Sequence, residues 1–419
     1  MLRNQKKTII TSFLLASILF SLVGCGGGGI SGGGPSGSSH VTITNNGSHY
    51  EVVLNYDNIS HYNIGAEYGE KILQVFPYPQ WLDSYIAMKL DNAHYETFLT
   101  NVGKIKPQID QDYRDEIHGL ASKLCAATDN VKGDGKLSID ELYLLNLYAD
   151  AVRQTQCAAL AVFGPLSATG SAMVGRILDM GFPEIQAVTT FRNGGQSICT
   201  IGYLGFMGVI SGFNRNKIFA AILDSPTNQE YSAAGKHSYP FDLRHALENL
   251  TTIDGVANYM ESPPYAFPHL IFLADPTSGK VLENNTTTGF RQARTAASAL
   301  GAAMTWGFPN AIGCVNSFLL AGNTNNTTTE TYNTARWNSL KTELSAKGDT
   351  VTLDELKEIV SYDGADGGPM GGEDGDLYNV STQQIILFEP DTLNLQVFFH
   401  PKDSDLPSDP NFEDISVSF

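Results

Sequence analysis

The sequence is poor in cysteine and in positive charge. Five of its 419 residues are cysteine, and no two stand at CxxC spacing, so neither a thioredoxin-like site nor a cysteine-based metal site is expected. Lys and Arg number 26 against 44 Asp and Glu, which gives a formal net charge of −18. Nucleic-acid binding depends on cations that neutralise phosphates. This balance therefore excludes nucleic acid from the expected partners, and it argues against a basic membrane-binding face.

Long hydrophobic runs are equally scarce. The longest stands near the N-terminus, from Ile9 to Phe20, and the basic residues Arg3, Lys6 and Lys7 precede it. It is shorter than the roughly 20 apolar residues that a membrane-spanning helix needs. A basic start followed by a short apolar run is typical of a secretory signal peptide. The sequence therefore predicts an exported protein.

The end of this apolar run carries a more specific signal. Residues Leu22 to Cys25 read Leu-Val-Gly-Cys and resemble the bacterial lipobox, in which the cysteine is diacylated before cleavage. We therefore expect residues 1–24 to be a lipoprotein signal peptide, with Cys25 as the lipid-bearing (palmitate-type) N-terminus. The alternatives are a plain signal peptide or an uncleaved anchor. Residues 25–40 are rich in Gly and Ser, as a flexible tether would be. The expected location is the cell envelope, at the outer membrane or cell surface, facing the periplasm or the exterior.

Beyond the tether, hydrophobic periodicity predicts a short hairpin followed by helices. Residues 41–56 alternate apolar and polar side chains around an Asn-Asn-Gly turn, which is a hairpin signal. Helical patterns cover residues 112–126 and 138–152. The second pattern opens with Ser138 and Glu141 in capping-box spacing, which satisfies free backbone amides at a helix N-terminus.

From residue 157 onward strand patterns dominate. Strands are expected over residues 157–163, 172–175, 188–191, 197–201, 218–223, 269–274, 280–283, 384–388 and 395–399. Helices are expected over residues 243–259, 332–344 and 352–360. Strands and helices grouped in blocks, without strict alternation, favour an α+β fold.

One segment resembles half of a calcium-binding loop. Residues 130–141 contain Asp-Gly-Lys-Leu-Ser, but the third ligand position of an EF-hand would be Lys132. An ammonium group cannot coordinate a cation, since the loop needs oxygen ligands there. A turn followed by a capped helix is the better interpretation. The sequence predicts no metal site and no other cofactor, and it leaves the oligomeric state open.

The cysteines that remain after Cys25 are scattered: Cys125, Cys157, Cys199 and Cys314. A disulfide is possible in an exported protein, but the spacing selects no pair. Cys157 stands directly before an apolar strand, and by composition alone such a cysteine is usually buried and inert.

Its downstream context gives Cys157 a second interpretation. An ordered series of motifs follows it, namely Gly175-Arg176-Ile177-Leu178-Asp179, Gly212-Phe213-Asn214, an apolar strand ending at Asp224, Ala274-Asp275…Gly279…Glu283, Cys314-Val315-Asn316, Ala335-Arg336, and a closing hairpin over residues 382–399. In this order they resemble the Ntn hydrolase family of acyl-coenzyme A:isopenicillin N acyltransferase-like enzymes, relatives of bile salt hydrolases and acid ceramidase-type amidases. Upstream, residues 63–70 and 115–121 resemble the pro-region of longer members.

This resemblance implies a fold and a processing event. The fold would be a four-layer αββα sandwich with a mostly helical N-terminal pro-segment. The chain would cut itself between Gln156 and Cys157, so that residues 41–156 become a small chain and residues 157–419 the catalytic chain. Since the tether belongs to the small chain, the catalytic chain would stay at the membrane through packing alone.

The resemblance also implies roles at the site. Cys157 would be the nucleophile, Arg176 would support its thiolate, and Asp179 would orient the α-amine or the substrate. Asn316 and the position of Asp224 would lie at the oxyanion. A structural ion pair between Arg176 and Asp179 is the alternative for those two residues.

Two further residues are assigned to substrate binding by the same resemblance. These are Asn214 and Arg336. For Asn214 a tight-turn role is the alternative, because asparagine is favoured in turns. For Arg336 the alternative is an exposed position on a helix.

Three residues depart from the family pattern. Gln156 stands where a small residue is common, Ala158 where Thr or Ser is usual, and Asp224 where bile salt hydrolases have an oxyanion-binding asparagine. An Asp-His element of the family is represented only by Asp363.

The expected function is cleavage of an N-acyl or peptide-like small amide through a thioester, by hydrolysis or acyl transfer. The alternative is an inactive lipoprotein of the same fold that binds a ligand or serves a structural role. A papain-like protease is not favoured, because its motif around the cysteine is absent.

Overall fold

The computed structural model describes residues 39–151, 156–179, 181–225, 232–301, 304–323, 331–364 and 375–419. The predicted signal peptide, Cys25 and most of the tether lie outside these residues. Among the helices described, none has the length and apolar character that crossing a bilayer requires. Residues 39–419 form one compact unit, and both predicted chains belong to it.

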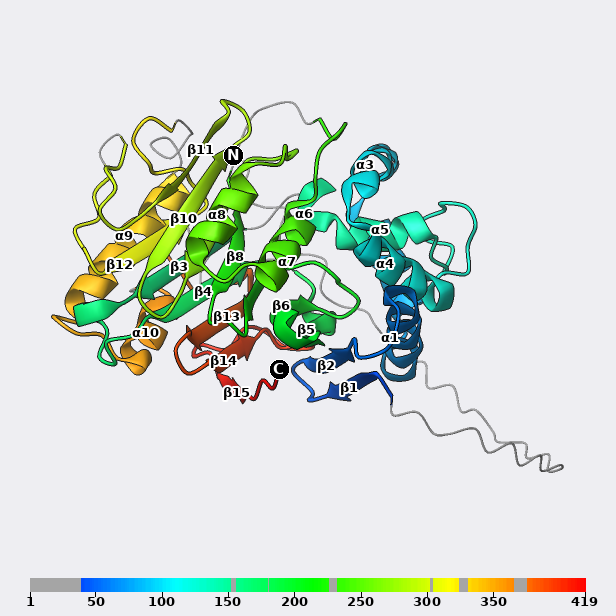
Figure 1. The fold of residues 1–419 in the computed structure, drawn as a ribbon, viewed down its shortest axis with the longest axis horizontal. Coiled ribbons are helices and arrows are strands. Elements are labelled where there is room, and N and C mark those ends of the chain that lie inside the picture. Colours follow the sequence, from blue (N-terminus) through cyan, green and yellow to red (C-terminus); the bar gives the residue numbers. More distant parts are fainter. Residues whose placement is uncertain are drawn as a thin grey trace, which may run out of the picture. The chain divides into compact units, whose positions relative to one another are not determined.

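The N-terminal part begins with a hairpin and continues with helices (Figure 1). Strands β1 (Val41–Asn45) and β2 (Tyr50–Asn55) pair antiparallel, as predicted. The helices that follow are α1 (His61–Val75), α2 (Tyr78–Lys89), α3 (Asn92–Ile105), α4 (Gln111–Leu124), α5 (Ile139–Asn146) and α6 (Tyr148–Ala151). The helix expected over residues 138–152 is therefore two helices. Its predicted capping box is present, because Ser138 and Glu141 each accept the other's backbone N–H.

One sheet of nine strands spans both predicted chains. Its order is β1-β2-β5-β6-β7-β8-β9-β10-β11. The added strands are β5 (Gln186–Arg192), β6 (Ile198–Tyr203), β7 (Ser211–Asn214), β8 (Phe219–Asp224), β9 (His269–Ala274), β10 (Gly279–Asn285) and β11 (Phe290–Arg294). Neighbours pair antiparallel except β2 and β5, which run parallel.

The second sheet has six antiparallel strands in the order β12-β3-β4-β13-β14-β15. They are β12 (Ala311–Val315), β3 (Gln156–Val162), β4 (Met173–Asp179), β13 (Thr382–Glu389), β14 (Asn394–Phe399) and β15 (Glu413–Ile415). The strand that carries Cys157 is thus an inner strand, between β12 and β4.

Alternating side chains of β3 show how the layers stack. Cys157, Ala159 and Ala161 belong to the core shared with the nine-stranded sheet. The intervening residues, such as Leu160, pack with Trp337 of α9 (Thr331–Ala346) and Leu356 of α10 (Leu353–Val360). This is the period-two alternation of a strand buried on both faces.

The outer layer on the other side is helical as well. Helices α7 (Tyr239–Asn249) and α8 (Ile253–Glu261) contact β7 to β11 of the nine-stranded sheet (Figure 1). The order helices, sheet, sheet, helices is the predicted αββα sandwich, and the predicted α+β class is confirmed. The single helix expected over residues 243–259 is wrong. It breaks before Thr252, whose side chain caps α8 by accepting from Gly255 N at 3.0 Å.

The calcium-like loop has an internal role. The amides of Gly133 and Gly135 point inward and donate to the carboxylate of Asp83 on α2, at 2.5 and 2.7 Å. Both glycines have positive φ, +80° and +79°, a conformation that glycine adopts without steric cost. The loop therefore presents backbone donors to an anion.

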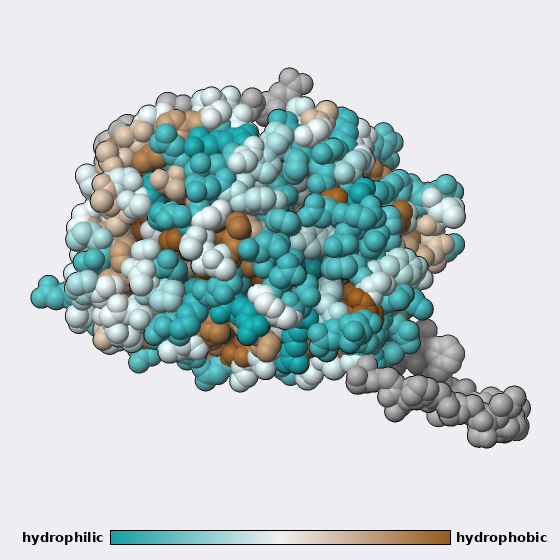
Figure 2. Space-filling view, in the orientation of Figure 1, coloured by the Kyte–Doolittle hydropathy of each residue, from teal (hydrophilic) through white to brown (hydrophobic). Residues whose placement is uncertain are grey.

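One face of the molecule is largely polar. The face in Figure 2 is mostly hydrophilic, and its apolar residues are scattered over it. The most exposed large apolar side chains of the described residues belong to different elements, for example Met88 on α2 and Val380 before β13.

Candidate active site

Cys157 lies where the two sheets face each other. It is the second residue of β3 and is fully buried. Its Sγ accepts a hydrogen bond from Nη2 of Arg176 at 3.3 Å. Burial raises the pKa of the Cys157 thiol, and the Arg176 guanidinium acts in the opposite direction. The thiol is therefore shielded from water and lies beside a cation.

Arg176 links the two sheets at this point. It is on β4, directly across from Ala159 of β3, and its side chain is fully buried. Nη2 also donates to the carbonyl of Ile222 on β8 at 2.8 Å, and Nη1 donates to the carbonyl of Ile177. These carbonyls fix the guanidinium beside the sulfur of Cys157.

Asp179 ends the same strand and pairs with a different arginine. Its Oδ2 lies 3.1 Å from Nη2 of Arg336, and its Oδ1 accepts from Oγ1 of Thr382 on β13 at 3.0 Å. Burial raises the pKa of the Asp179 carboxyl, and Arg336 opposes this shift. The ion pair considered from the sequence, between Arg176 and Asp179, is replaced by Asp179 with Arg336.

Arg336 is part of this cluster, so the exposed helix position considered for it is wrong. Its side chain on α9 is fully buried because this face of the helix packs on the six-stranded sheet. Nη1 donates to the carbonyl oxygen of Cys157 at 3.1 Å. One guanidinium thus holds both the Asp179 carboxylate and the backbone of Cys157.

Asn316 holds the other side of Cys157. It follows β12 directly, and its Oδ1 accepts from the backbone N–H of Cys157 at 2.5 Å. Its Nδ2 donates to the carbonyl of Asp224 at 2.8 Å, and its own carbonyl accepts from Nδ2 of Asn333 at 3.1 Å. Asn316 was expected to lie at the oxyanion; its side-chain oxygen faces the backbone nitrogen of Cys157, and its NH₂ group donates to the carbonyl of Asp224.

Asp224 ends β8 beside this amide and is buried. Its Oδ1 lies 3.4 Å from the hydroxyl of Tyr239 at the start of α7. That hydroxyl also donates to the carbonyl of Ala149 at 2.5 Å. Ala149 is on α6, just before the predicted cleavage point. Tyr239 therefore joins the part of the chain that follows Cys157 to helix α6, which precedes it.

Asn214 is not brought to this cluster. It ends β7 at the beginning of β8, whereas Asp224 ends that strand, roughly 16 Å away at about 3.3 Å per residue. Its Nδ2 donates to the carbonyls of Leu247 and Leu250, and its Oδ1 accepts from Ile218 N. Asn214 closes the β7–β8 turn and ties it to the end of α7.

The other described cysteines differ from Cys157. Cys125, Cys199 and Cys314 are unpaired, and burial raises the pKa of each thiol to about 12. The thiols of Cys125 and Cys314 donate to backbone carbonyls. Among the described cysteines, Cys157 is the one whose sulfur accepts from a guanidinium, which is the polarity that stabilises a thiolate.

Sequence reasoning missed three members of the site: Asn333, Thr382 and Tyr239. A signal was available for the first, because Asn333 lies three residues before Arg336 and both fall on the buried face of α9. Thr382 and Tyr239 reach the cluster from distant elements, and no local pattern marks them.

Comparison with known proteins gives only distant likenesses. No family model and no curated protein matches the chain. The solved structure of a Caenorhabditis elegans ortholog of N-acylethanolamine-hydrolyzing acid amidase matches with 15% identity and a TM-score of 0.37, over 56% of this chain and 93% of that one. A variant of the conjugated bile acid hydrolase from Clostridium perfringens matches with 13% identity and a TM-score of 0.37, over 62% and 97%. Penicillin V acylase from Agrobacterium tumefaciens matches with 11% identity and a TM-score of 0.36, over 61% and 84%.

Proposed function

We propose that this protein is a self-processing amide hydrolase whose nucleophile is Cys157. One observation carries the proposal: Arg176 donates to the sulfur of Cys157, while Asn316 accepts from its nitrogen. An N-terminal cysteine nucleophile needs both atoms held, the sulfur to attack and the nitrogen to take up a proton. Arg176 is a hydrogen-bond donor, which favours a thiolate, and Asn316 is an acceptor, which favours a protonated nitrogen.

The first reaction would be cleavage of the chain itself. The thiolate of Cys157 attacks the carbonyl carbon of Gln156, a C–S bond forms, and the C–N bond to Cys157 breaks as its nitrogen takes a proton. Water then hydrolyses the thioester, which leaves a carboxylate on Gln156 and a free amine and thiol on Cys157. Arg336 keeps the carbonyl of Cys157 in place throughout.

Turnover on an external substrate would follow the same chemistry. A free α-amine titrates at about 7.7–8.0, so it takes the thiol proton near neutral pH. The thiolate attacks the substrate amide, the amine product leaves with that proton, and water hydrolyses the thioester. The substrate class we propose is an N-acyl or peptide-like small amide. An acceptor other than water would give acyl transfer.

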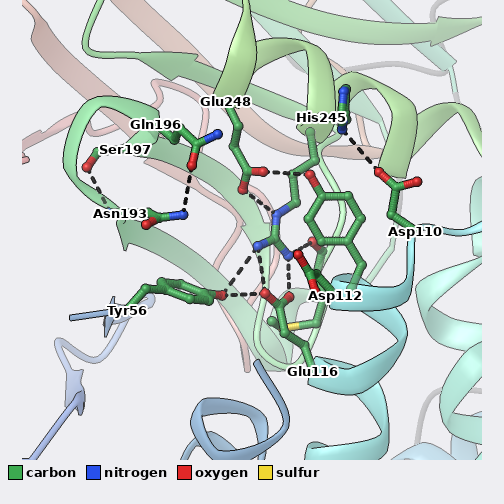
Figure 3. A network of polar contacts seen from close by, with 12 residues as sticks. Tyr56, Asp110, Asp112, Glu116, Asn193, Gln196, Ser197, His245 and Glu248 are labelled. Carbon is green, nitrogen blue, oxygen red and sulfur yellow. Dashed lines mark hydrogen bonds and ion pairs between the residues drawn. The ribbon is translucent and has the colours of Figure 1, made fainter. Parts of the chain in front are cut away.

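The two chains would remain joined after cleavage by more than apolar packing. Strand β2 of the small chain pairs with β5 of the catalytic chain from Tyr50 opposite Ala187 to Asn55 opposite Arg192. Figure 3 shows a second link, in which Tyr56, Glu116 and Glu248 converge on one guanidinium. These polar contacts would therefore hold the two chains together in addition to packing.

That guanidinium belongs to Arg244 of α7, and it is buried. It donates to both carboxylate oxygens of Glu116 on α4, at 2.5 and 2.9 Å, and to Glu248 at 2.8 Å. It also lies over the ring of Tyr113 at 4.2 Å. With a lipid on Cys25, these contacts would keep the catalytic chain at the envelope membrane.

Amine release from a panel of small N-acyl amides tests the enzymatic proposal. The purified protein should release amine, Cys157→Ala should not, and Cys199→Ala should behave as the unaltered protein because that thiol is outside the site. Equal activity of the Cys157→Ala protein would overturn the assignment. A folded, uncleaved protein that binds amides without turnover would instead support the binding-lipoprotein alternative. Palmitate labelling that Cys25→Ala abolishes tests the anchor.

A further inference from the structure

A buried carboxylate outside the cysteine cluster organises the loop that carries Asn316. Glu283 is on β10, and it is fully buried. Its Oε1 accepts from the amide of Leu319 at 2.8 Å, and both its oxygens lie 3.1 Å from the amide of Leu320. Nδ2 of Asn323 donates to Oε2 at 2.9 Å. Successive backbone amides that converge on one anion form a nest, so the loop after β12 is wrapped around this carboxylate.

An arginine extends this anchor to the strand before Asn316. Arg294 on β11 is buried and donates from Nε to Oε1 of Glu283 at 3.0 Å. Its Nη2 donates to the carbonyl of Gly313 on β12 at 2.6 Å. Gly313 lies three residues before Asn316 and Leu319 three residues after it. The ion pair thus holds the chain on both sides of Asn316.

Between these anchors the backbone has little freedom. The amide of Ser317 donates to the carbonyl of Val315 at 2.6 Å, so the chain turns tightly at Asn316. Asn333 fixes the carbonyl of Asn316. The direction of the Asn316 side chain toward Cys157 therefore depends on where the flanking residues are held.

Stability alone gives little reason for a buried ion pair at this place. Removing two charges from water costs several kcal/mol, and well-packed apolar residues of similar volume are often as stabilising or more so. The contacts of Glu283 and Arg294 are directional and converge on the segment from Gly313 to Asn323. These contacts restrict the path of the chain from Gly313 to Asn323.

We propose that Glu283, paired with Arg294, is a positioning residue that aims the side-chain oxygen of Asn316 at the nitrogen of Cys157. This inference rests on the proposed function. After cleavage, Asn316 accepts from the α-amine of Cys157, and an acceptor favours the protonated amine. Loosening the loop therefore lowers the pKa of that amine as well as slowing the reaction.

The test compares Glu283→Gln with Asn316→Ala and with Glu116→Gln. Glutamine keeps the shape of Glu283 but turns an NH₂ group toward amide donors. Glu116→Gln is the matched control, because it removes the anion of the other buried Arg–Glu pair, which joins α4 to α7. The readouts are kcat, KM, and the pH dependence of kcat/KM for amide hydrolysis.

We expect kcat of Glu283→Gln to fall roughly 10- to 100-fold. The acid limb of its pH profile of kcat/KM should shift to lower pH, as in Asn316→Ala. The positioning role would be overturned if the acid limb of Glu283→Gln stayed at the pH of the unaltered protein and its activity fell no further than that of Glu116→Gln. An unaltered protein that neither cleaves itself nor hydrolyses amides would instead refute the proposed function.

A second measurement does not depend on activity or on how well Glu283→Gln folds. Asn323→Ala removes one donor to the carboxylate and leaves the ion pair intact. In the uncleaved Cys157→Ala background, this change should speed hydrogen exchange at Leu319 and Leu320 at least 10-fold and leave the amides of β13 unchanged. Unchanged exchange at both loop amides would contradict the anchor.

Discussion

The side-chain oxygen of Asn316 lies 2.5 Å from the backbone nitrogen of Cys157. That nitrogen is an amide in the intact chain and would be the general base after cleavage. The N–H requires an acceptor, so the oxygen of Asn316 faces it, and the NH₂ group is left to donate to Asp224.

Replacing Asn316 should slow chemistry more than it weakens the fold. We expect Asn316→Ala to reduce the rate of self-cleavage on the order of 10²-fold, comparable to the loss of a well-placed polar group in an active site. Appearance of the 157–419 fragment on a denaturing gel measures this rate.

Asn214→Ala is the matched control for that experiment. It removes an asparagine that closes the β7–β8 turn, so it should lower the free energy of unfolding by about 1–3 kcal/mol and leave the cleavage rate within a few-fold. A strong loss of cleavage in folded Asn214→Ala, equal to that in Asn316→Ala, would refute the separate roles of the two asparagines.

The pH dependence of cleavage should follow the thiol of Cys157. Burial raises the pKa of this thiol in the intact chain, so only a small fraction is thiolate near neutral pH. The cleavage rate should therefore rise with pH, up to tenfold per unit below the pKa. Arg176→Gln removes the cation that opposes the shift, so its profile should lie at higher pH. A rate that is flat or falls from pH 6 to 9 would contradict the thiolate mechanism.

Removing one partner of the Arg244–Glu116 pair should lower the free energy of unfolding more than replacing both partners does. Arg244→Met leaves the fully buried carboxylate of Glu116 without its arginine partner, which should cost about 3–5 kcal/mol of unfolding free energy. The double variant Arg244→Met with Glu116→Leu should recover most of that loss. Denaturant unfolding in the Cys157→Ala background measures both. Additive losses would show that the pair is not coupled.

His61 should make stability depend on pH. Its hydrogen bond to Glu116 raises the pKa of the imidazole above the ordinary value near 6.5. The stabilisation is therefore fully present below about pH 6.5 and is lost as the pH rises through the raised pKa of His61. His61→Gln should flatten the decrease in stability between pH 6 and pH 8.5, whereas His94→Gln, on the exposed face of α3, should not. An unchanged slope in His61→Gln would refute the linkage.

Local signals in the sequence predicted local structure well. The capping box expected at Ser138 forms because it needs only residues three apart. The nine strands expected from residue 157 onward are all present, as β3, β4, β5, β6, β8, β9, β10, β13 and β14, because their apolar runs and turn residues are close in sequence. Strands β7, β11, β12 and β15 were not predicted. The five residues of β12 are small or apolar, include Gly313, and are all buried, which removes the alternation.

The site could be predicted only in part, because its contacts join distant elements. The motifs singled out Cys157, Arg176 and Asn316, which the fold brings together. They did not indicate that Arg336 is buried, nor that its carboxylate partner is Asp179. Which atom of Asn316 faces Cys157 depends on donors from β3 and acceptors from β8, and no spacing along the chain encodes that.

The most direct test of the central claim is the N-terminal sequence of the purified protein's fragments. We expect a new N-terminus that reads Cys-Ala-Ala-Leu-Ala from Cys157, with both fragments co-eluting under native conditions. Cys157→Ala should remain a single chain, while Cys314→Ala should be cleaved. An unaltered protein that is folded and stays intact, or a Cys157→Ala protein cut at the same bond, would contradict it.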